Sequence, residues 1–327
     1  MLEIIASFIK QAIIQGIPLL YGSTGEILTE KSGNLNLGIP GIMYIGGISG
    51  VIGAYFYEKS VVDINPFLCV MFPLLCSILG SVLMALIYCF LTVTLRANQN
   101  VTGLALTTFG VGVGNFFGGS LSSLFGEGGS ISLIRTGACF KATLPFASKL
   151  GLFGDTFLSF GFLAYLAIVI ALLCSWFLNR TRAGLSLRAV GESPATADAA
   201  GINVTKYKYL ATCIGAAIAG LGGLYFIMDY IGGAWTNGGF GDRGWLAIAL
   251  VIFALWKPKY SILGSILFGG LYIVYLYIPG LSRSSQEIFK MLPYVVTIVV
   301  LIVLSIRNRR ENQPPESLGL SYFREDR

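Results

Sequence analysis

The chain has 327 residues, a formal net charge of +6 and no histidine. It is 55% apolar and only 12% charged, roughly half the charged share of a soluble globular domain, and its mean hydropathy is +0.76. This composition excludes a water-soluble fold and a disordered chain and indicates a polytopic membrane protein. Because imidazole is absent, His-ligated metals, Ser-His and Cys-His dyads and imidazole proton relays are excluded as well.

Apolar runs recur along the whole chain, and a membrane span needs about 20 mostly apolar residues. The run at 66–94 is longer than one span needs, which predicts a tilt or an end along the membrane surface. The run at 243–256 is short and predicts a half-helix. We therefore predict an all-α membrane protein with about nine transmembrane helices, eight to ten, in two halves with interrupted helices. The predicted spans are 4–28, 39–57, 66–94, 101–120, 156–179, 207–230, 243–256, 260–279 and 289–306.

Lysine and arginine gather in alternate loops, which predicts an orientation with the C-terminus inside and the N-terminus outside. The first apolar run follows no basic leader and is predicted to remain as an uncleaved span. The transmembrane domain then covers 1–306, and 307–327 form a cytoplasmic tail, of which we expect 311–327 to be solvated. Predicted inside are Lys31, Arg96, Arg180, Arg182, Arg188, Lys206, Lys208, Lys257, Lys259, Arg307, Arg309 and Arg310. Predicted outside are Lys59, Arg135, Lys141, Lys149, Arg243, Arg283 and Lys290.

Small residues at every fourth position mark three of the predicted spans. Such spacing lets helix backbones approach closely, and we expect ordinary packing within the bundle. The three series are Gly110, Gly114 and Gly118; Gly215, Ala219 and Gly223; and Ser261, Ser265 and Gly269.

Two segments rich in glycine and amides, 33–41 and 235–244, interrupt the apolar pattern. Irregular backbone at membrane depth survives only where protein buries it or a wet cavity lines it. Interrupted segments at matching places in two halves point to a transport site, although ordinary surface loops are the alternative. Asp229 and Arg243 flank the second segment and either pair with each other or face a delivery protein.

The segment 180–206 encodes a short helix with both ends specified. Ser193 suits the N-cap, Pro194 the first helical position and Gly201 the position after the end. The residues between them are mostly alanine, so the helix is marginal alone in water but can dock closely on a partner. A capped loop helix without a partner is the alternative.

Two short motifs resemble nucleotide-binding sequences but lack the structural context that such sites need. The cysteines form no CxxC motif. The stretch 25–32 nearly matches a P-loop, but Glu30 replaces the second glycine and no strand precedes it. The GxGxxG match at 239–244 lacks a βαβ unit. Five cysteines lie inside apolar runs and read as small core residues, while Cys139 stands alone in a loop.

Four stretches, in order along about residues 10–306, resemble the permeases of the ribose/branched-chain amino acid ABC importer family. They are TGEILTEKSG at 24–33 with NLG at 36–38 and GIM at 41–43; ANQNVTGLAL at 97–106; LRAVGESP at 187–194 with AAGINV at 199–204; and GDRGWLAIA at 241–249 with VIF at 251–253, Trp256 and Pro258. The branch that the chain most resembles comprises nucleoside importers served by a basic membrane lipoprotein. Pro40 stands where the family usually has an acidic residue, so no role of that carboxylate is carried over.

The resemblance implies a multi-pass permease of the bacterial plasma membrane that forms half of a pore with a second, homologous permease. An extracellular lipoprotein would deliver the cargo, and a separate cytoplasmic ATPase would bind ATP and Mg²⁺. This chain would hold no cofactor or metal, catalyse no covalent reaction and bind no nucleic acid. The residues implied in ATPase coupling are Glu192, Ser193, Pro194, Ala195, Ala197, Asp198, Ala199 and Gly201.

A path for a neutral nucleoside needs amides and hydroxyls rather than charges. We predict that it is lined by Asn34, Asn36, Asn100, Thr107, Thr108, Asn115 and Phe240. Simple sugars or branched-chain amino acids are alternative cargos. A secondary transporter or channel is the alternative of another class, but the spans offer almost no central acids for ion coupling. A membrane-embedded enzyme would need a catalytic cluster, and the sequence reveals none.

Overall fold

The computed structural model describes residues 2–124, 131–143, 151–307 and 313–324. Within these ranges the chain is helical, and its only β-type pairing is one antiparallel bridge between Ser132 and Ala234. The predicted all-α class is therefore confirmed for the described part. Lys149, Arg309 and Arg310, which the sequence assigns to sides of the membrane, lie outside the described residues.

Eight helical segments among the described residues are long and apolar enough to cross a membrane. A further helix, α11 (Arg243–Phe253), is too short, which confirms the expected half-helix. The long segments are α1 (Leu2–Glu30), α2 (Ile39–Ser60), α3 (Pro66–Cys89) with η1 (Phe90–Thr94), α4 (Gln99–Leu124), α7 (Phe162–Arg180), α10 (Val204–Tyr225) with η3 (Phe226–Tyr230), α12 (Pro258–Ile273) with η4 (Val274–Tyr277), and α13 (Arg283–Lys290) with α14 (Leu292–Arg307).

The run predicted at 156–179 is not one helix. Helix α6 (Gly151–Phe157) ends early, and α7 starts after an extended Gly161. A side chain at Gly161 would press on the Asp229 carboxylate and the Phe140 carbonyl, so the chain packs tightly here and turns. The preceding connection also contains α5 (Ile134–Phe140), which the sequence did not predict.

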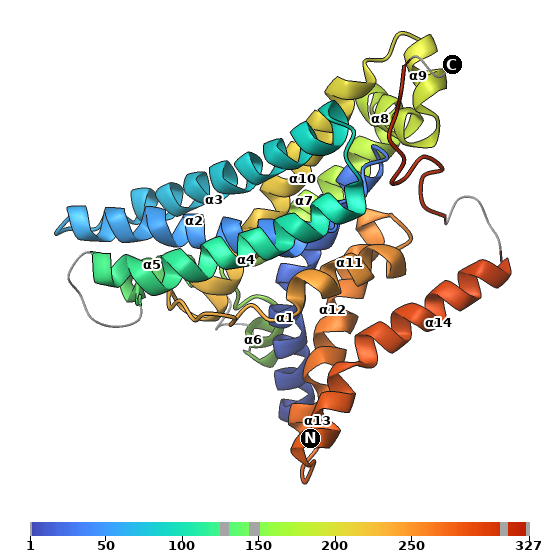
Figure 1. Ribbon diagram of the computed structural model, residues 1–327. Helices are drawn as coiled ribbons and strands as arrows, with labels where there is room; N and C mark the ends of the chain where they lie inside the picture. The colour runs from blue at the N-terminus through green and yellow to red at the C-terminus, as the bar shows by residue number, and fades with distance from the viewer. Residues whose placement is uncertain (1, 125–130, 144–150, 308–312, 325–327) are drawn as a thin grey trace.

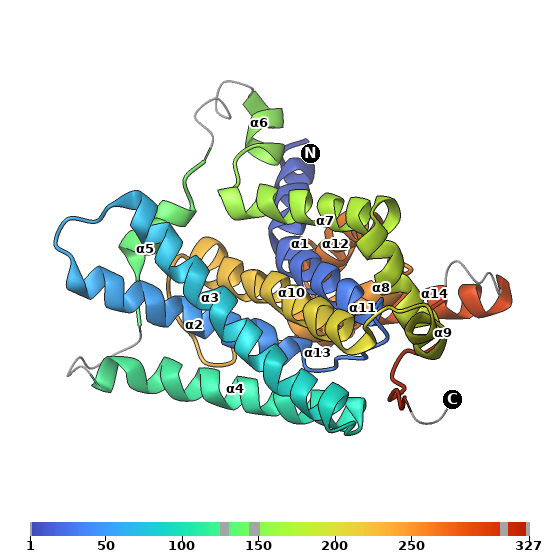
Figure 2. The same ribbon diagram turned by 90° about the horizontal axis from the view of Figure 1, so that it is seen from above.

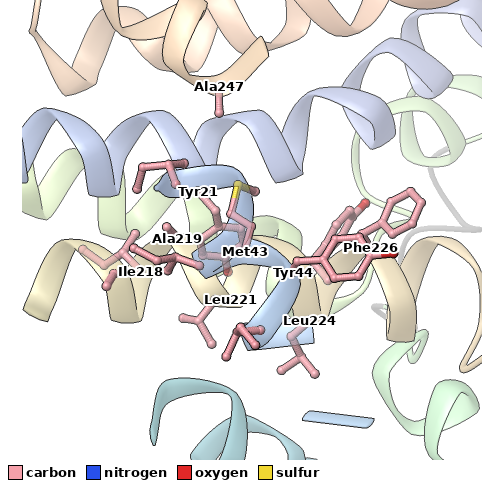
Figure 3. Close-up of a cluster of buried hydrophobic side chains, with 14 of the residues drawn as sticks. Tyr21, Met43, Tyr44, Ile218, Ala219, Leu221, Leu224, Phe226 and Ala247 are labelled. Carbon is pink, nitrogen blue, oxygen red and sulfur yellow. The ribbon is translucent and has the colours of Figure 1, made fainter. Parts of the chain in front are cut away.

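Helices α1, α2 and α10 form the centre of the bundle, with α3 and α12 packed on either side (Figures 1 and 2). Close backbone contacts replace bulky side chains where they cross. Gly25 of α1 meets Gly215 of α10, and Gly46 of α2 meets Gly220 of α10. Buried apolar side chains such as Met43 and Leu224 fill the space around these crossings (Figure 3). The predicted close packing of small residues is confirmed.

One end of the bundle gathers the 31–38 loop, α8 (Arg182–Glu192), α9 (Pro194–Ala199) and residues 313–324, whereas the N-terminus lies at the opposite end (Figure 1). We call 313–324 the C-terminal strap. The Ser317 N–H donates to the Gly191 carbonyl at 3.1 Å, and the Gly319 N–H donates to the Gly33 carbonyl at 3.2 Å. The expectation of a solvated tail is corrected in part: the backbone of Ser317 and Gly319 bonds the bundle and Pro315 and Ser317 are buried, whereas half of the residues of 313–324 are exposed.

Candidate functional site

The 31–38 loop between α1 and α2 is almost entirely buried, and polar side chains hold it there. The Asn36 N–H donates to Glu26 Oε1 at 3.1 Å, and Asn36 Oδ1 accepts from the Gly38 N–H at 2.9 Å. Asn34 Nδ2 donates to Thr212 Oγ1 at 3.0 Å. Asn34 Oδ1 and Asn36 Nδ2 are buried without a partner. Both amides therefore support the loop and keep hydrogen-bonding capacity that the chain itself does not use.

Neighbouring helices satisfy the backbone of this loop. Gln99 Oε1 accepts from the Leu35 N–H at 2.7 Å, and the Tyr88 hydroxyl donates to the Leu35 carbonyl at 2.6 Å. The Thr107 hydroxyl donates to the Leu37 carbonyl at 2.7 Å. Buried irregular backbone at this depth is possible because these partners replace water. Sequence reasoning missed Gln99 and Tyr88.

Two buried carboxyl groups stand one helical turn apart at the end of α1. Glu26 holds the 31–38 loop, and Glu30 accepts a hydrogen bond from the indole of Trp256, which follows α11. The end of α1 is thereby tied to the first interrupted segment and to the connection between α11 and α12 (Pro258–Ile273). Burial lowers the pKa of the neighbouring Lys31 from its ordinary value, and the Glu192 carboxylate opposes that effect.

Tyr44 of α2 is the centre of the second interrupted region, the 231–242 loop. Its hydroxyl donates to Asn115 Oδ1 at 2.6 Å and accepts from the Gly238 N–H at 2.8 Å. Its ring meets Trp235 edge-on, with centroids 5.4 Å apart. Side chains at Gly114 and Gly118 would strike the Tyr44 and Trp235 rings, so these glycines of α4 make room for aromatic rings as well as backbone.

The aromatic rings close a small cavity beside Tyr44. Phe240 packs edge-on against Phe226, with centroids 5.1 Å apart, and Figure 3 places Phe226 beside Tyr44. The free space is about 10 Å³, room for about one water molecule. In this structure the region is therefore closed. Its lining is Met43, Tyr44, Gly223, Phe226, Ile227, Ile231, Ala234, Trp235, Thr236 and Phe240.

Arg243 opens α11 as a buried cation. Its guanidinium donates to the Phe240 carbonyl and to Gln15 Oε1, both at 2.9 Å. It also lies 4.4 Å from the centroid of the Phe226 ring, a cation–π contact. Of the alternatives that the sequence left open for Arg243, the structure supports neither a pair with Asp229 nor exposure, because Gln15 and backbone carbonyls receive its donors.

The two interrupted segments touch each other. Helix α2 begins next to Pro40 and α11 next to Gly244, and a Cβ on Gly244 would lie 2.5 Å from the Pro40 Cα. The N-terminal ends of two helices therefore meet inside the bundle. Pro40 occupies the first turn of α2, where its missing N–H leaves no helix bond unmade.

The seven residues predicted to line a path fall into three places. Asn34, Asn36 and Thr107 gather at the 31–38 loop, while Asn115 and Phe240 lie around Tyr44. Asn100 and Thr108 lie on the exposed face of α4. The sequence did not predict four residues of this region as site residues: Tyr44, Trp235, Gln15 and Arg243. Polar or aromatic side chains inside glycine-rich spans are the sequence feature that could have indicated them.

The segment 180–206 contains the predicted short helix with the predicted ends. The Ser193 side chain accepts from the Thr196 N–H, Pro194 opens α9, and Gly201 has φ +83° just beyond it. Ala197 is buried against Val190 and Val204.

The two sides of α9 face different surroundings. Ala195 and Ala199 are exposed. Asp198 is covered by the C-terminal strap: it accepts from the Tyr322 hydroxyl at 2.8 Å and pairs with Arg324 at 3.2 Å. The exposed surface of α9 is therefore the Ala195 and Ala199 side.

A bundle of apolar helices around two interrupted segments, which meet at the buried Pro40 and Gly244, defines a membrane transport subunit. The chain belongs to the family described as branched-chain amino acid transport system / permease component, which matches residues 8–301.

Individual relatives match nearly the full length. The chain is 32% identical over 297 residues to the nucleoside ABC transporter permease protein NupC of Lactococcus lactis, covering 90% of each chain. It is 28% identical over 304 residues to the guanosine ABC transporter permease protein NupQ of Bacillus subtilis, covering 91% of this chain and 92% of NupQ. It is 30% identical over 349 residues to TsgC13 of Haloferax volcanii, named provisionally as a glucose ABC transporter permease, covering 98% of each.

Proposed function

We propose that this chain is a membrane-spanning permease subunit of an ATP-driven importer whose cargo is a nucleoside. Two relatives that match about nine-tenths of the chain carry the words nucleoside and guanosine in their names, and this observation carries the choice of cargo. The chemistry of the interior fits it, because amides, hydroxyls and aromatic rings suit a neutral solute with ribose hydroxyls and a planar base.

The contact of the 231–242 loop with Tyr44 of α2 is the proposed gate. Tyr44 connects α2, α4 and the 231–242 loop, and Arg243 connects that loop to α1 through Gln15. The cavity of about 10 Å³ cannot hold a nucleoside. Passage therefore requires the 231–242 loop to move away from Tyr44, which would expose hydrogen-bonding groups and ring faces to the cargo.

Energy for that motion would come from a separate ATPase that binds ATP and Mg²⁺. We propose that the exposed side of α9, with Ala195 and Ala199, docks on it, and that this chain itself catalyses no covalent reaction. The end of α1 would transmit motion of α9 into the bundle. It packs on α8, where Gly191 meets the Lys31 carbonyl, and Glu30 near this end accepts a hydrogen bond from Trp256.

A second, homologous permease would complete the pore as a heterodimer. The exposed face of α4 carries the polar Asn100 and Thr108 among apolar side chains. A polar group facing lipid is unfavourable, so we propose that this face turns toward the partner permease. Figure 2 shows α4 along one edge of the bundle, where a partner has access.

We propose the orientation that the Lys and Arg bias favours, in the bacterial plasma membrane with the N-terminus outside. The α8–α9 end, which the strap shares, then faces the cytoplasm. The opposite end receives cargo from an extracellular binding lipoprotein.

A sugar is the second candidate cargo, since TsgC13 covers nearly the whole chain. The test is uptake of radiolabelled guanosine, uridine and glucose into vesicles holding the complete importer, with and without ATP. ATP-dependent uptake of a nucleoside, blocked by excess unlabelled nucleoside but not by glucose, is expected. Glucose uptake alone would overturn the cargo, and uptake without ATP would overturn the mechanism.

A further inference from the structure

Two pairs of neighbouring cysteines lie at opposite ends of α3. The Cys69 thiol, in the first turn of α3, lies close enough to the Cys139 thiol of α5 to interact with it. The Cys89 thiol, at the last turn of α3, likewise lies near the Cys213 thiol of α10. Twenty residues of helix separate Cys69 from Cys89, about 30 Å, the thickness of the bilayer hydrocarbon. The two pairs therefore face opposite compartments.

The geometry around Cys69 is set by α5. The Cys69 thiol donates to Thr136 Oγ1 at 3.4 Å, and Thr136 stands one turn before Cys139 on the same helix. The Thr136 hydroxyl in turn donates to Glu58 Oε2 at 2.8 Å. Cys69 is fully buried, whereas Cys139 is partly exposed. The sequence shows Cys139 alone in a loop, but in the fold it stands beside a second thiol.

We propose that Cys69 and Cys139 form a disulfide in the working importer, and that Cys89 and Cys213 remain thiols. This rests on the proposed orientation, which puts α5 at the oxidising outer face and the Cys89 end in the reducing cytoplasm. The end assignment follows the contacts: Tyr88, beside Cys89, bonds the 31–38 loop at the α8–α9 end.

The oxidant is the disulfide of an extracytoplasmic thiol–disulfide oxidoreductase. The partly exposed Cys139 thiolate attacks one of its sulfurs, and the other leaves as a thiolate. The Cys69 sulfur, having given up its proton, then attacks Cys139 in this mixed disulfide and releases the second thiolate. Two electrons and two protons pass from the cysteines to the oxidant, and one S–S bond replaces another.

This bond would fix the segment that covers the closed cavity. The Leu133 N–H, at the start of α5, donates to the Gly233 carbonyl at 2.9 Å, and the Trp235 N–H donates to the Ile131 carbonyl at 3.0 Å. Holding α5 on α3 therefore holds Trp235 over Tyr44. The bridge would close a loop of about 70 residues, a length at which a cross-link strongly restricts the unfolded chain.

Differential alkylation of the importer, purified without reductant, tests the proposal. The denatured protein is alkylated, reduced and alkylated again with an isotopically heavier reagent, and each cysteine is read by mass spectrometry. Cys69 and Cys139 should carry mainly the second label, and Cys89 and Cys213 the first. In Cys139→Ser, Cys69 should move to the first label, and reductant should lower the melting temperature of the wild type but not of this variant. First-step labelling of both Cys69 and Cys139 in the wild type would overturn the disulfide.

A second measurement separates the bond from the orientation. In Cys69→Ser, a membrane-impermeant maleimide added to intact cells should label Cys139. Labelling there, with no bridge in the wild type, would overturn the disulfide and leave the orientation standing. Labelling only after the membrane is opened would overturn both.

Discussion

The Tyr44 hydroxyl joins three segments with one oxygen, donating to Asn115 and accepting from Gly238. Loss of this buried hydroxyl would be costly mainly because it leaves two other groups, the Asn115 amide oxygen and the Gly238 N–H, without hydrogen-bond partners. Around it, Gly114 supplies the space and Trp235 the edge-on contact. At the scale of single residues, the closed state of the proposed gate therefore depends on the hydrogen bonds and the ring contact of Tyr44.

Tyr44→Phe should weaken the closed state, because the Gly238 N–H and Asn115 Oδ1 lose their partner. The expected cost is about 1–3 kcal/mol, with reduced ATP-dependent uptake. Thermal unfolding and uptake assays on the purified importer measure both. Tyr260→Phe, at an exposed ring, is the matched control and should change neither. Equal behaviour of the two variants would contradict the role of the Tyr44 hydroxyl.

Arg243→Lys should impair transport although the charge is kept. A lysine ammonium lacks the planar fork that reaches both Gln15 and the Phe240 carbonyl and that faces the Phe226 ring. We expect a loss of about 1–3 kcal/mol of stability and at least a tenfold fall in uptake. Arg182→Lys, on an exposed part of α8, is the control. Wild-type uptake by Arg243→Lys would show that positive charge alone suffices.

At the scale of elements, α9 has two sides with different tasks. Ala197 belongs to the small core with Val190 and Val204, so a bulky substitution there would disturb the fold of the segment. Ala195 and Ala199 are exposed, so substitutions there change the outer surface alone. The strap covers Asp198 and thereby fixes which side of α9 remains free.

Ala199→Glu should weaken ATPase docking while the permease still folds and inserts. A loss of about 2 kcal/mol at the centre of an interface lowers affinity roughly thirtyfold. Copurification of the ATPase and ATP-dependent uptake are the measurements. Ala142→Glu, the same change at an exposed position of the opposite end, should retain both. Full copurification and uptake with Ala199→Glu would contradict docking by this side of α9.

Asp198→Ala should loosen the strap, because Tyr322 and Arg324 lose their acceptor. The hydrogen bond to Tyr322 is worth about 1 kcal/mol, and the exposed pair with Arg324 adds little. Limited proteolysis should then cleave 180–206 faster. Asp198→Asn keeps an acceptor for Tyr322 and should behave much more like the wild type. Unchanged cleavage of Asp198→Ala would show that the strap does not support α9.

At the scale of the whole molecule, glycine-mediated contacts hold the central helices close together. Gly46 meets Gly220 where α2 crosses α10, and Gly25 meets Gly215 where α1 crosses α10. Lipid gives no hydrophobic drive for helices to associate, so close van der Waals packing must supply the attraction. Within this bundle the two interrupted segments meet at the buried Pro40 and Gly244.

Gly46→Ala should destabilise the bundle, because the added methyl would press on the Gly220 Cα and lie 2.6 Å from Ser81 Oγ. Overpacking of this kind costs about 1–3 kcal/mol. Gly112→Ala, where a Cβ meets open space, is the control and should be neutral or stabilising. Thermal unfolding compares them, and a Gly46→Ala melting temperature equal to that of the wild type would contradict the packing argument.

The sequence by itself determined the helical membrane class, the short 243–256 element, the packing of small residues and both ends of α9. Each of these depends on local properties: hydropathy over a span, spacing along one helix, or the backbone preferences of Ser193, Pro194 and Gly201. The same local logic failed at 156–179, where α6 ends at Phe157 and α7 begins after an extended Gly161 that packs against Asp229 and Phe140.

Only the tertiary structure decided what those elements do together. Hydrogen bonds between residues far apart in the chain join Tyr44 to Gly238, Arg243 to Gln15, and the strap to α9. Composition could indicate only a polar tail at 313–324, because its acceptors, on α8, α9 and the 31–38 loop, lie far from it in the chain and meet it only after folding. The low charge of the chain thus indicated a membrane protein, and the long-range contacts joined its few polar groups into the closed region around Tyr44 and the strap that covers Asp198.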